Sequence, residues 1–240
     1  MKVSVILPSA GLGTRMRGAA ENTGTSRKQF MLLEGVPILI HTVRKFVACQ
    51  HVHEVVIALR AEDLDWVREL LAHENFQKPV RCVEGGETRQ HSVENALATL
   101  SPEIDIVAVH DAVRPFVDAE TISAVILQAS HTGAAIVGIV PVDTVKQVQR
   151  HVVRGTLNRD RLVLAQTPQV FKADLLRQAF LRAREDGFVG TDESSLVERL
   201  EQVEVTVVAG SDRNIKITKP SDMDLARLFL AEESAERKVS

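Results

Sequence analysis

The chain has 240 residues, 45% of them hydrophobic, and a formal net charge of -3. This length and hydrophobic content suffice for one large α/β core. The slightly acidic balance argues against a protein that coats nucleic acid, which normally carries a basic surplus, so any polyanion that it binds is expected to be small.

No segment predicts targeting or membrane insertion. The apolar run after Lys2 has only five residues before Pro8, and the longest apolar stretch, 134–142, is about half of the roughly 18 residues that a membrane-spanning helix needs. Cys49 and Cys82 have no CxxC or His-rich spacing around them. We therefore interpret both as free thiols and expect a cytoplasmic protein.

Short runs rich in Val and Ile alternate with helical patterns in the first part of the chain. The predicted strands are Val3–Leu7, Val55–Leu59, Val80–Val83, Ile106–His110 and Ala135–Val140. The predicted helices between them are Ile38–Phe46, Asp63–His73, Gln90–Leu100 and Ala119–Ser130. Strands joined by crossover helices form parallel sheets, and continuously apolar strands are buried on both faces. We therefore expect a single Rossmann-like, doubly wound α/β domain over 1–240 with a mostly parallel sheet.

The pattern changes to polar alternation after Pro141. Val145–Gln149 and Val152–Leu157 flank a turn at His151, which predicts a projecting β-hairpin at about 141–161. An isolated two-stranded hairpin is marginal in water, so this one needs a surface to lie against. We expect it to be a dimerisation arm.

The α/β pattern resumes after the arm. We take Glu193 and Glu198 there as solvated surface residues. The predicted elements are strands at Leu162–Phe171, Val203–Ala209 and Ile215–Thr218, a helix at Ala173–Glu185, and a terminal helix with Ser221 as its N-cap.

The loop after the first strand is suited to phosphates. Gly11 and Gly13 let backbone N–H groups approach an anion closely, and Arg15 adds a planar set of donors. Met16 stands where the third glycine of the dinucleotide fingerprint would be, and the spacing alone fits an ordinary turn better. Lys28 makes a phosphate-binding loop the better interpretation, because this second cation would reach the same anion as Arg15 if the chain folds back.

A second loop, after the third strand, is a candidate site for a base. Gly85 and Gly86 can admit a flat ring against the backbone, and Ser92 can hydrogen-bond a polar edge of it. The alternative is a glycine turn with Arg89 on the surface.

Polar residues also follow the fourth predicted strand. Asp111 can accept from polyol hydroxyls or hold water on Mg²⁺, or it can simply pair with Arg114 as structure. We interpret His110 as a packed or surface histidine rather than a base, because attack by a phosphate needs no base.

Six motifs, in this order, resemble those of the 2-C-methyl-D-erythritol 4-phosphate cytidylyltransferases, a group that includes related ribitol-5-phosphate enzymes. They are Pro8–Met16, Lys28–Phe30, Gly85–Gly86 with Ser92–Val93, His110–Pro115, Thr167–Gln169 and Asn214–Lys216. The similarity runs along nearly the whole chain, although the stretch Arg17–Arg27 predicts a long, mobile loop.

The resemblance implies a set of site residues. The implied catalytic cations are Arg15, Lys28 and Lys216. The implied nucleotide-binding residues are Ser9, Ala10, Gly11, Gly13, Gly86, Glu87 and Ser92. The implied acceptor-binding residues are Asp111, Arg114 and Thr167, with Thr144 and Arg159 reaching in from the partner's arm.

The resemblance also implies a reaction. The enzyme is expected to be a homodimer joined by exchanged arms that transfers CMP from CTP to a polyol phosphate. The acceptor is 2-C-methyl-D-erythritol 4-phosphate, and the pathway is non-mevalonate isoprenoid biosynthesis. Mg²⁺ is the expected ion, held mainly by the CTP phosphates, with Asp111 as a candidate ligand. Two alternatives remain open: a cytidylyltransferase for another polyol phosphate such as ribitol 5-phosphate, and a non-catalytic nucleotide-binding protein.

Overall fold

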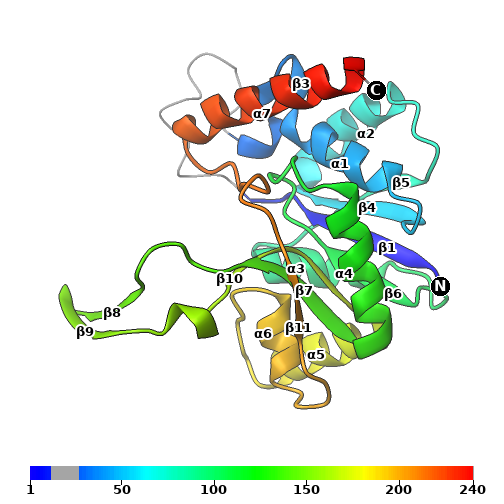
Figure 1. The fold of residues 1–240 in the computed structure, drawn as a ribbon. Coiled ribbons are helices and arrows are strands. Elements are labelled where there is room, and N and C mark those ends of the chain that lie inside the picture. Colours follow the sequence, from blue (N-terminus) through cyan, green and yellow to red (C-terminus); the bar gives the residue numbers. More distant parts are fainter. Residues whose placement is uncertain (12–26, 240) are drawn as a thin grey trace.

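A seven-stranded sheet forms the centre of the molecule (Figure 1). The structure, a computed structural model, describes residues 1–11 and 27–239, apart from the side chains of 236–239. Within these residues the strand order is β11-β7-β10-β6-β1-β4-β5. The strands are β1 (Val3–Pro8), β4 (Glu54–Leu59), β5 (Val80–Glu84), β6 (Ile106–Val109), β7 (Ala134–Ile139), β10 (Leu164–Lys172) and β11 (Thr206–Ala209). β10 runs antiparallel to β6 and β7, and the other neighbours are parallel, which confirms the mostly parallel α/β sheet.

Helices cover both faces of this sheet. Along β1, Val5 and Leu7 face one hydrophobic cluster, whereas Ile6 faces the other, and all three are fully buried. This is why the strands are continuously apolar rather than alternating. The first cluster includes α1 (Ile38–Ala48), α2 (Leu64–Ala72) and α4 (Ala119–Thr132). The second includes α3 (Arg89–Ala98), α5 (Ala173–Glu185) and α6 (Glu193–Glu198).

The chain changes direction across the sheet at β1. From β1 it passes through α1 to β4 and through α2 to β5, all on one side of β1. It then returns through α3, on the opposite face, to β6 on the other side of β1. In open α/β sheets such a reversal leaves a crevice at the carboxyl ends of the strands, where ligands bind.

A third hydrophobic cluster joins the segment before α1 to the carboxyl-terminal part of the chain. The long helix α7 (Pro220–Val239) contributes Met223 to it, and the short hairpin of β2 (Leu32–Leu33) and β3 (Val36–Pro37) contributes Leu33. The 3₁₀ helix η3 (Lys28–Phe30) leads directly into this hairpin. The packing therefore anchors the segment that carries Lys28.

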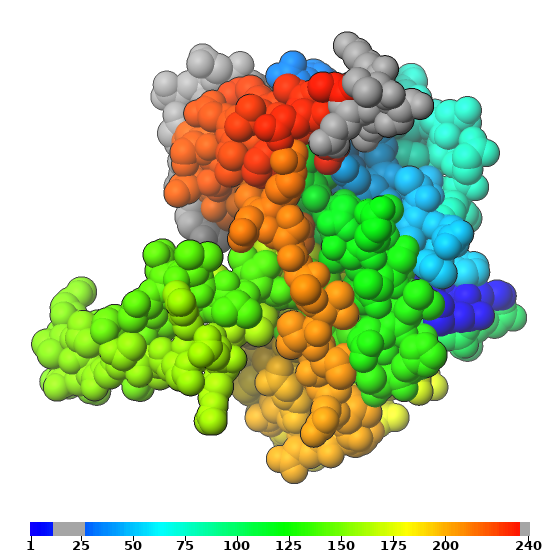
Figure 2. Space-filling view, viewed as in Figure 1, coloured from blue at the N-terminus to red at the C-terminus, as the bar shows by residue number. Residues whose placement is uncertain are grey.

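The hairpin predicted after Pro141 is present and projects from the body of the molecule (Figures 1 and 2). β8 (Lys146–Gln149) pairs with β9 (Val152–Thr156) in antiparallel register. Arg150 and His151 form the turn with φ of 49° and 63°, as a tight two-residue hairpin turn requires. Another short 3₁₀ helix, η5 (Arg159–Arg161), follows the arm, and η4 (Ala61–Asp63) precedes α2.

Two predictions near the carboxyl end are wrong. Residues 215–218 are not a strand, because the chain there crosses toward the loop after β6, where Ile217 N–H donates to the Val113 carbonyl. α7 begins at Pro220, which suits a first helical position because proline has no N–H to satisfy. Asp222 reaches back to accept from the N–H groups of the two residues before the proline, so Ser221 is not the N-cap.

The described part of the chain contains no helix that is both long and apolar enough to cross a membrane. Both cysteines are free.

Candidate active site

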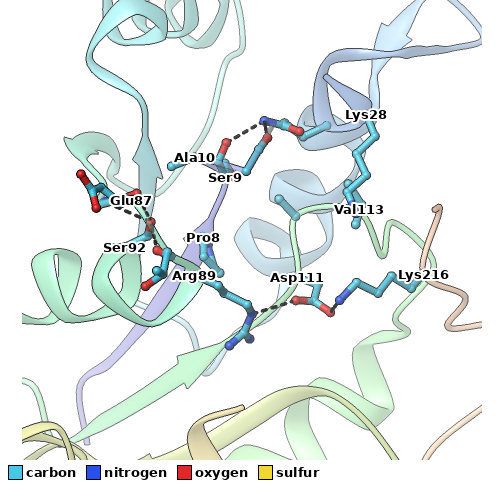
Figure 3. A pocket seen from close by; sticks show the side chains of 15 residues that line it. Pro8, Ser9, Ala10, Lys28, Glu87, Arg89, Ser92, Asp111, Val113 and Lys216 are labelled. Atoms are coloured by element: carbon cyan, nitrogen blue, oxygen red, sulfur yellow. Dashed lines mark hydrogen bonds and ion pairs between the residues drawn. The ribbon is translucent and has the colours of Figure 1, made fainter. Parts of the chain in front are cut away.

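A pocket lies where the loops after β1, β5 and β6 meet, at the crevice that the strand order creates (Figure 3). Further sides of it come from η3 and from the segment before α7. The lining residues are Pro8, Ser9, Ala10, Gly11, Lys28, Gln29, Gly86, Glu87, Thr88, Arg89, Ser92, Asp111, Ala112, Val113 and Lys216. Most of the residues singled out in the sequence are therefore brought to one place.

A buried glutamine connects η3 to the loop after β1. Gln29 Nε2 donates to the Ser9 carbonyl at 2.7 Å, and the Gly11 carbonyl lies 3.3 Å from the same nitrogen. Ser9 N–H itself donates to the Ala58 carbonyl, which continues the ladder between β1 and β4. Lys28, next to Gln29, is thereby held at the rim of the pocket, a role for Gln29 that the sequence did not indicate. The predictions for Gly13, Arg15 and most of Arg17–Arg27 lie outside the described residues.

The loop after β5 is closed by the hydroxyl of Ser92. Its Oγ accepts from Gly86 N–H at 3.1 Å and donates to the Thr88 carbonyl at 2.8 Å. Thr88 in turn caps α3. A Cβ at Gly85 would lie 2.9 Å from the Ala10 Cβ, so a glycine is needed for the two loops to approach this closely.

Asp111 lies between three cations, of which Figure 3 shows Arg89 and Lys216. Its Oδ1 is 3.3 Å from Arg89 Nε, and its Oδ2 is 3.3 Å from Arg114 Nε and 2.9 Å from Lys216 Nζ. Burial alone would raise the pKa of Asp111, but Arg89, Lys216 and Arg114 outweigh burial and hold this pKa well below its usual value. The carboxylate is therefore ionised.

A chain of hydrogen bonds through two buried residues, Thr167 and His110, positions the backbone of Asp111. Its N–H donates to Thr167 Oγ1 at 3.0 Å, and that hydroxyl lies 3.1 Å from His110 Nδ1. His110 Nε2 lies 3.0 Å from the Arg114 carbonyl, which can only accept, so Nε2 carries the proton and Nδ1 accepts from Thr167. Burial lowers the pKa of His110 to about 4. The interpretation of His110 as a packed histidine is confirmed, and Thr167 supports Asp111 from beneath the pocket.

Asn214 connects β10, which carries Thr167, to the segment that carries Lys216. Its Nδ2 donates to Gln166 Oε1 at 3.0 Å and to the Thr167 carbonyl at 2.9 Å. Its own carbonyl accepts from Arg114 at 2.7 Å. The motif containing Asn214 was visible in the sequence, but its contacts with β10 were not.

The expectation that Glu193 is a solvated surface residue is wrong. Its side chain is 1% exposed, and Oε1 lies 2.6 Å from an Arg89 guanidinium nitrogen. Arg89 is thus not a free surface residue either. Asp192 accepts from Ser195 N–H and caps α6, a pattern that is legible in the sequence, but only the packing of α6 against the sheet buries Glu193. Glu198, at the other end of α6, is exposed as expected.

Comparison with known proteins identifies the family. The model of the 2-C-methyl-D-erythritol 4-phosphate cytidylyltransferase family matches residues 3–232. The chain belongs to this family. The resemblance seen in the six motifs is confirmed, and the chain is a nucleotidyltransferase of the cytidylyltransferase class.

Relatives match this cytidylyltransferase over almost its whole length. The 2-C-methyl-D-erythritol 4-phosphate cytidylyltransferase of Solibacter usitatus is 66% identical over 100% of both chains. That of Acidobacterium capsulatum is 49% identical over 98% of this chain and 100% of its own. The crystal structure of the 4-diphosphocytidyl-2C-methyl-D-erythritol synthase of Anaerococcus prevotii has a TM-score of 0.83 at 29% identity, covering 96% of this chain and 98% of that one. The Francisella tularensis cytidylyltransferase structure has a TM-score of 0.78 at 34% identity, covering 95% and 99%.

The two acceptor residues predicted on the arm do not line the pocket of their own chain. Arg159 instead donates to the Val142 carbonyl at the base of the arm, and Thr144 precedes β8. The arm points away from the body (Figure 1). For these residues a role in binding the acceptor stays a prediction.

The described residues of this cytidylyltransferase do not form a protein cage for a metal ion. Across 1–11 and 27–239 there is no group of three or more His, Cys, Asp or Glu side chains that could hold one. Both oxygens of Asp111, the candidate ligand, already face cations. No set of protein ligands for Mg²⁺ is therefore assigned among the described residues.

Proposed function

We propose that this chain transfers CMP from CTP to 2-C-methyl-D-erythritol 4-phosphate, giving pyrophosphate and 4-diphosphocytidyl-2-C-methyl-D-erythritol in non-mevalonate isoprenoid biosynthesis. One observation carries the proposal: Lys28 and Lys216 face the same pocket as the glycine loop after β5 and the ionised Asp111. Such a pocket has cations for two phosphorylated substrates, a glycine loop that a base can approach, and a carboxylate for polyol hydroxyls. The full-length similarity to named cytidylyltransferases supports the same assignment.

The mechanism needs no covalent intermediate and no general base. A 4-phosphate oxygen of the acceptor attacks the α-phosphorus of CTP in line, and the bond to pyrophosphate breaks. The second pKa of a phosphate monoester is about 6, so the nucleophile is already largely dianionic at neutral pH. Catalysis then consists of bringing two anions together and stabilising the charge that develops, which we assign to Arg15, Lys28 and Lys216.

Base selection is assigned to the loop after β5. The Ser92 hydroxyl accepts from Gly86 N–H and donates to the Thr88 carbonyl, so only a lone pair is left for a ligand. A lone pair favours a base with an amino group, as in cytosine, over one with a carbonyl there, as in uracil. Ala10, Gly11 and Glu87 line the same part of the pocket and are assigned to the nucleotide with it.

Acceptor binding is assigned to the cluster around Asp111 and to a second chain. Asp111 accepts from polyol hydroxyls, Arg114 and Lys216 hold the phosphate, and Thr167 supports them. Thr144 and Arg159 complete the pocket from the partner's arm. Exposed apolar side chains along the arm support a homodimer, because a hairpin that presents them to water needs a partner: Val142, Val148, Val152, Val153 and Leu157.

Two further assignments belong to this proposal. Mg²⁺ would be held mainly by the CTP phosphates, where it would offset their negative charge, since no three His, Cys, Asp or Glu side chains among the described residues form a group that could hold it. The chain works as one domain in the cytoplasm, whose reducing conditions suit its two free thiols.

The test is pyrophosphate release from methylerythritol phosphate and from ribitol 5-phosphate, each with CTP, ATP and UTP. The highest kcat/KM is expected with methylerythritol phosphate and CTP. A preference for ribitol 5-phosphate would reassign the acceptor. No release in any combination would contradict an enzyme and favour a nucleotide-binding protein.

A further inference from the structure

Glu193 is a buried carboxylate that touches no assigned substrate group. It is the first residue of α6, and its side chain is 1% exposed. Oε1 lies 2.6 Å from Arg89, whereas Oε2 is buried with no hydrogen-bond partner in the described structure. Burial raises the pKa of Glu193, and the Arg89 charge opposes this. Burying a carboxylate costs free energy, and the contact with Arg89 offsets part of that cost. We therefore asked what this contact does for the site.

The backbone around Glu193 is held firmly against β10. Asp192 Oδ1 accepts from Ser195 N–H at 3.1 Å, and its Oδ2 accepts from Gln169 Nε2 at 2.8 Å. Gln169 Oε1 in turn accepts from Ser194 N–H at 3.0 Å. These bonds tie the start of α6 to the central sheet. Glu193 is therefore presented from a fixed position.

Arg89 connects this fixed carboxylate to Asp111. It is the first residue of α3, directly after the loop assigned to the base, and its Nε faces Asp111 (Figure 3). Another nitrogen of the same guanidinium faces Glu193. A guanidinium fork matches phosphate oxygens as well as carboxylates. Without Glu193, Arg89 would be free to turn toward the substrate anions instead of Asp111.

The two oxygens of Asp111 consequently have different surroundings. Oδ1 faces Arg89, which a buried partner holds in place. Oδ2 faces Arg114 and Lys216, and the Lys216 side chain is 36% exposed. If Lys216 turns to a bound phosphate, Oδ2 is the oxygen that becomes available to a hydroxyl group.

We propose that Glu193 is a positioning residue: acting through Arg89, it fixes the Asp111 carboxylate so that Oδ2 faces the hydroxyl groups of the acceptor. The chain of contacts from Glu193 through Arg89 to Asp111, called the relay below, also links the loop that binds the base to the pocket that binds the acceptor. This inference rests on the proposed function, because it assumes that Asp111 binds a polyol phosphate.

The first test is Glu193→Gln, which keeps the size of the side chain and removes its charge. Loss of the charged hydrogen bond to Arg89 predicts a KM for methylerythritol phosphate raised roughly tenfold or more, with the KM for CTP nearly unchanged. Glu198→Gln, on the exposed end of the same helix, is the matched control and should leave both constants unchanged. Equal changes in both KM values, or a lower Tm with unchanged KM values, would overturn the relay.

A second variant tests the relay without changing the buried carboxylate. Arg89→Lys replaces the fork with a point charge that cannot face both carboxylates at once, so the same rise in acceptor KM is expected. In a relay the double variant should be no worse than the poorer single variant. Additive losses in acceptor KM would show two independent effects and contradict the relay.

The proposed function is checked separately with the unsubstituted enzyme. Pyrophosphate release from CTP and methylerythritol phosphate supports it and makes the KM comparison meaningful. No release overturns the proposed function and the relay together. Release by the unsubstituted enzyme with an unchanged acceptor KM in Glu193→Gln overturns the relay alone.

Discussion

Asp111 shows how one buried carboxylate can organise a polyanion site. Arg89, Arg114 and Lys216 would repel one another beside the pocket if no anion lay among them. The carboxylate offsets part of this repulsion and keeps the cations close enough to act on one substrate. The remaining positive charge is available to phosphate groups.

Lys28→Ala tests the assignment of a catalytic cation at the residue scale. Removing one donor to developing charge in a water-poor site costs roughly 10²–10³ in kcat. We expect kcat in steady-state assays to fall by that order and the KM for CTP to change much less. Lys219→Ala, whose side chain is exposed outside the pocket, is the control. An unchanged kcat would remove Lys28 from the catalytic group.

His110 predicts a pH dependence of stability. Burial lowers its pKa from 6.5 to about 4, so the folded state keeps it neutral while the unfolded chain binds a proton. Its contribution is present above about pH 6.5 and is lost as the pH falls toward 4, amounting to about 3 kcal/mol in the free energy of unfolding.

The measurement is denaturant unfolding between pH 7 and pH 4.5. His110→Gln should lose less stability over this range than the unsubstituted protein does. His131→Gln, at an exposed position near the end of α4, should keep the original slope. Identical slopes for all three proteins would contradict the role of His110.

At the scale of elements, β10 has the widest influence on the site. It is the antiparallel strand between β6 and β7, and it carries Thr167 beneath Asp111 and Gln169 beside α6. One strand therefore supports both Asp111 and Glu193. The arm precedes β10 directly, so the same strand also fixes where the arm leaves the body.

Arg159→Ala tests the arm as a part of the acceptor site. If Arg159 reaches the partner's pocket, its loss should raise the KM for methylerythritol phosphate and leave that for CTP nearly unchanged in steady-state assays. Arg161→Ala, in the same 3₁₀ helix and equally exposed, is the matched control. A change confined to CTP would remove Arg159 from the acceptor pocket.

At the scale of the whole molecule, the arm presents an apolar surface that no other part of the described chain covers. Val148 and Val153 are paired across the hairpin and are 56% and 57% exposed. In a dimer they would be covered by the second copy. Val148→Asp with Val153→Asp would then place two charges in that interface.

Sedimentation velocity measures the outcome directly. The unsubstituted protein is expected to sediment as a dimer and the double variant as a monomer. The monomer should still bind CTP but should need more acceptor for half-maximal rate, because Arg159 would no longer reach a partner. A monomeric unsubstituted protein, or a variant that remains dimeric, would contradict the proposed assembly.

Local patterns account for much of the fold. Residues close in sequence suffice to predict the strands β1, β4 and β7 and the helix α5, because apolar runs and helical periodicity are properties of neighbouring side chains. The arm follows from polar alternation around His151 for the same reason. Residues 215–218 are apolar and β-branched enough to predict a strand, but no described strand pairs with them. Their contact with the loop after β6, which is distant in sequence, decides their conformation.

The candidate site divides in the same way. Glycines, cations and Asp111 can be recognised from short motifs, since their chemistry and their position after strands are local properties of the chain. Glu193 lies about a hundred positions from Arg89, and nothing near it in the sequence distinguishes it from exposed Glu198. The packing of α6 against β10 and the rest of the sheet buries Glu193 and brings it to Arg89. The same packing decides which cations face each oxygen of Asp111, because only folding brings such distant segments within hydrogen-bond distance.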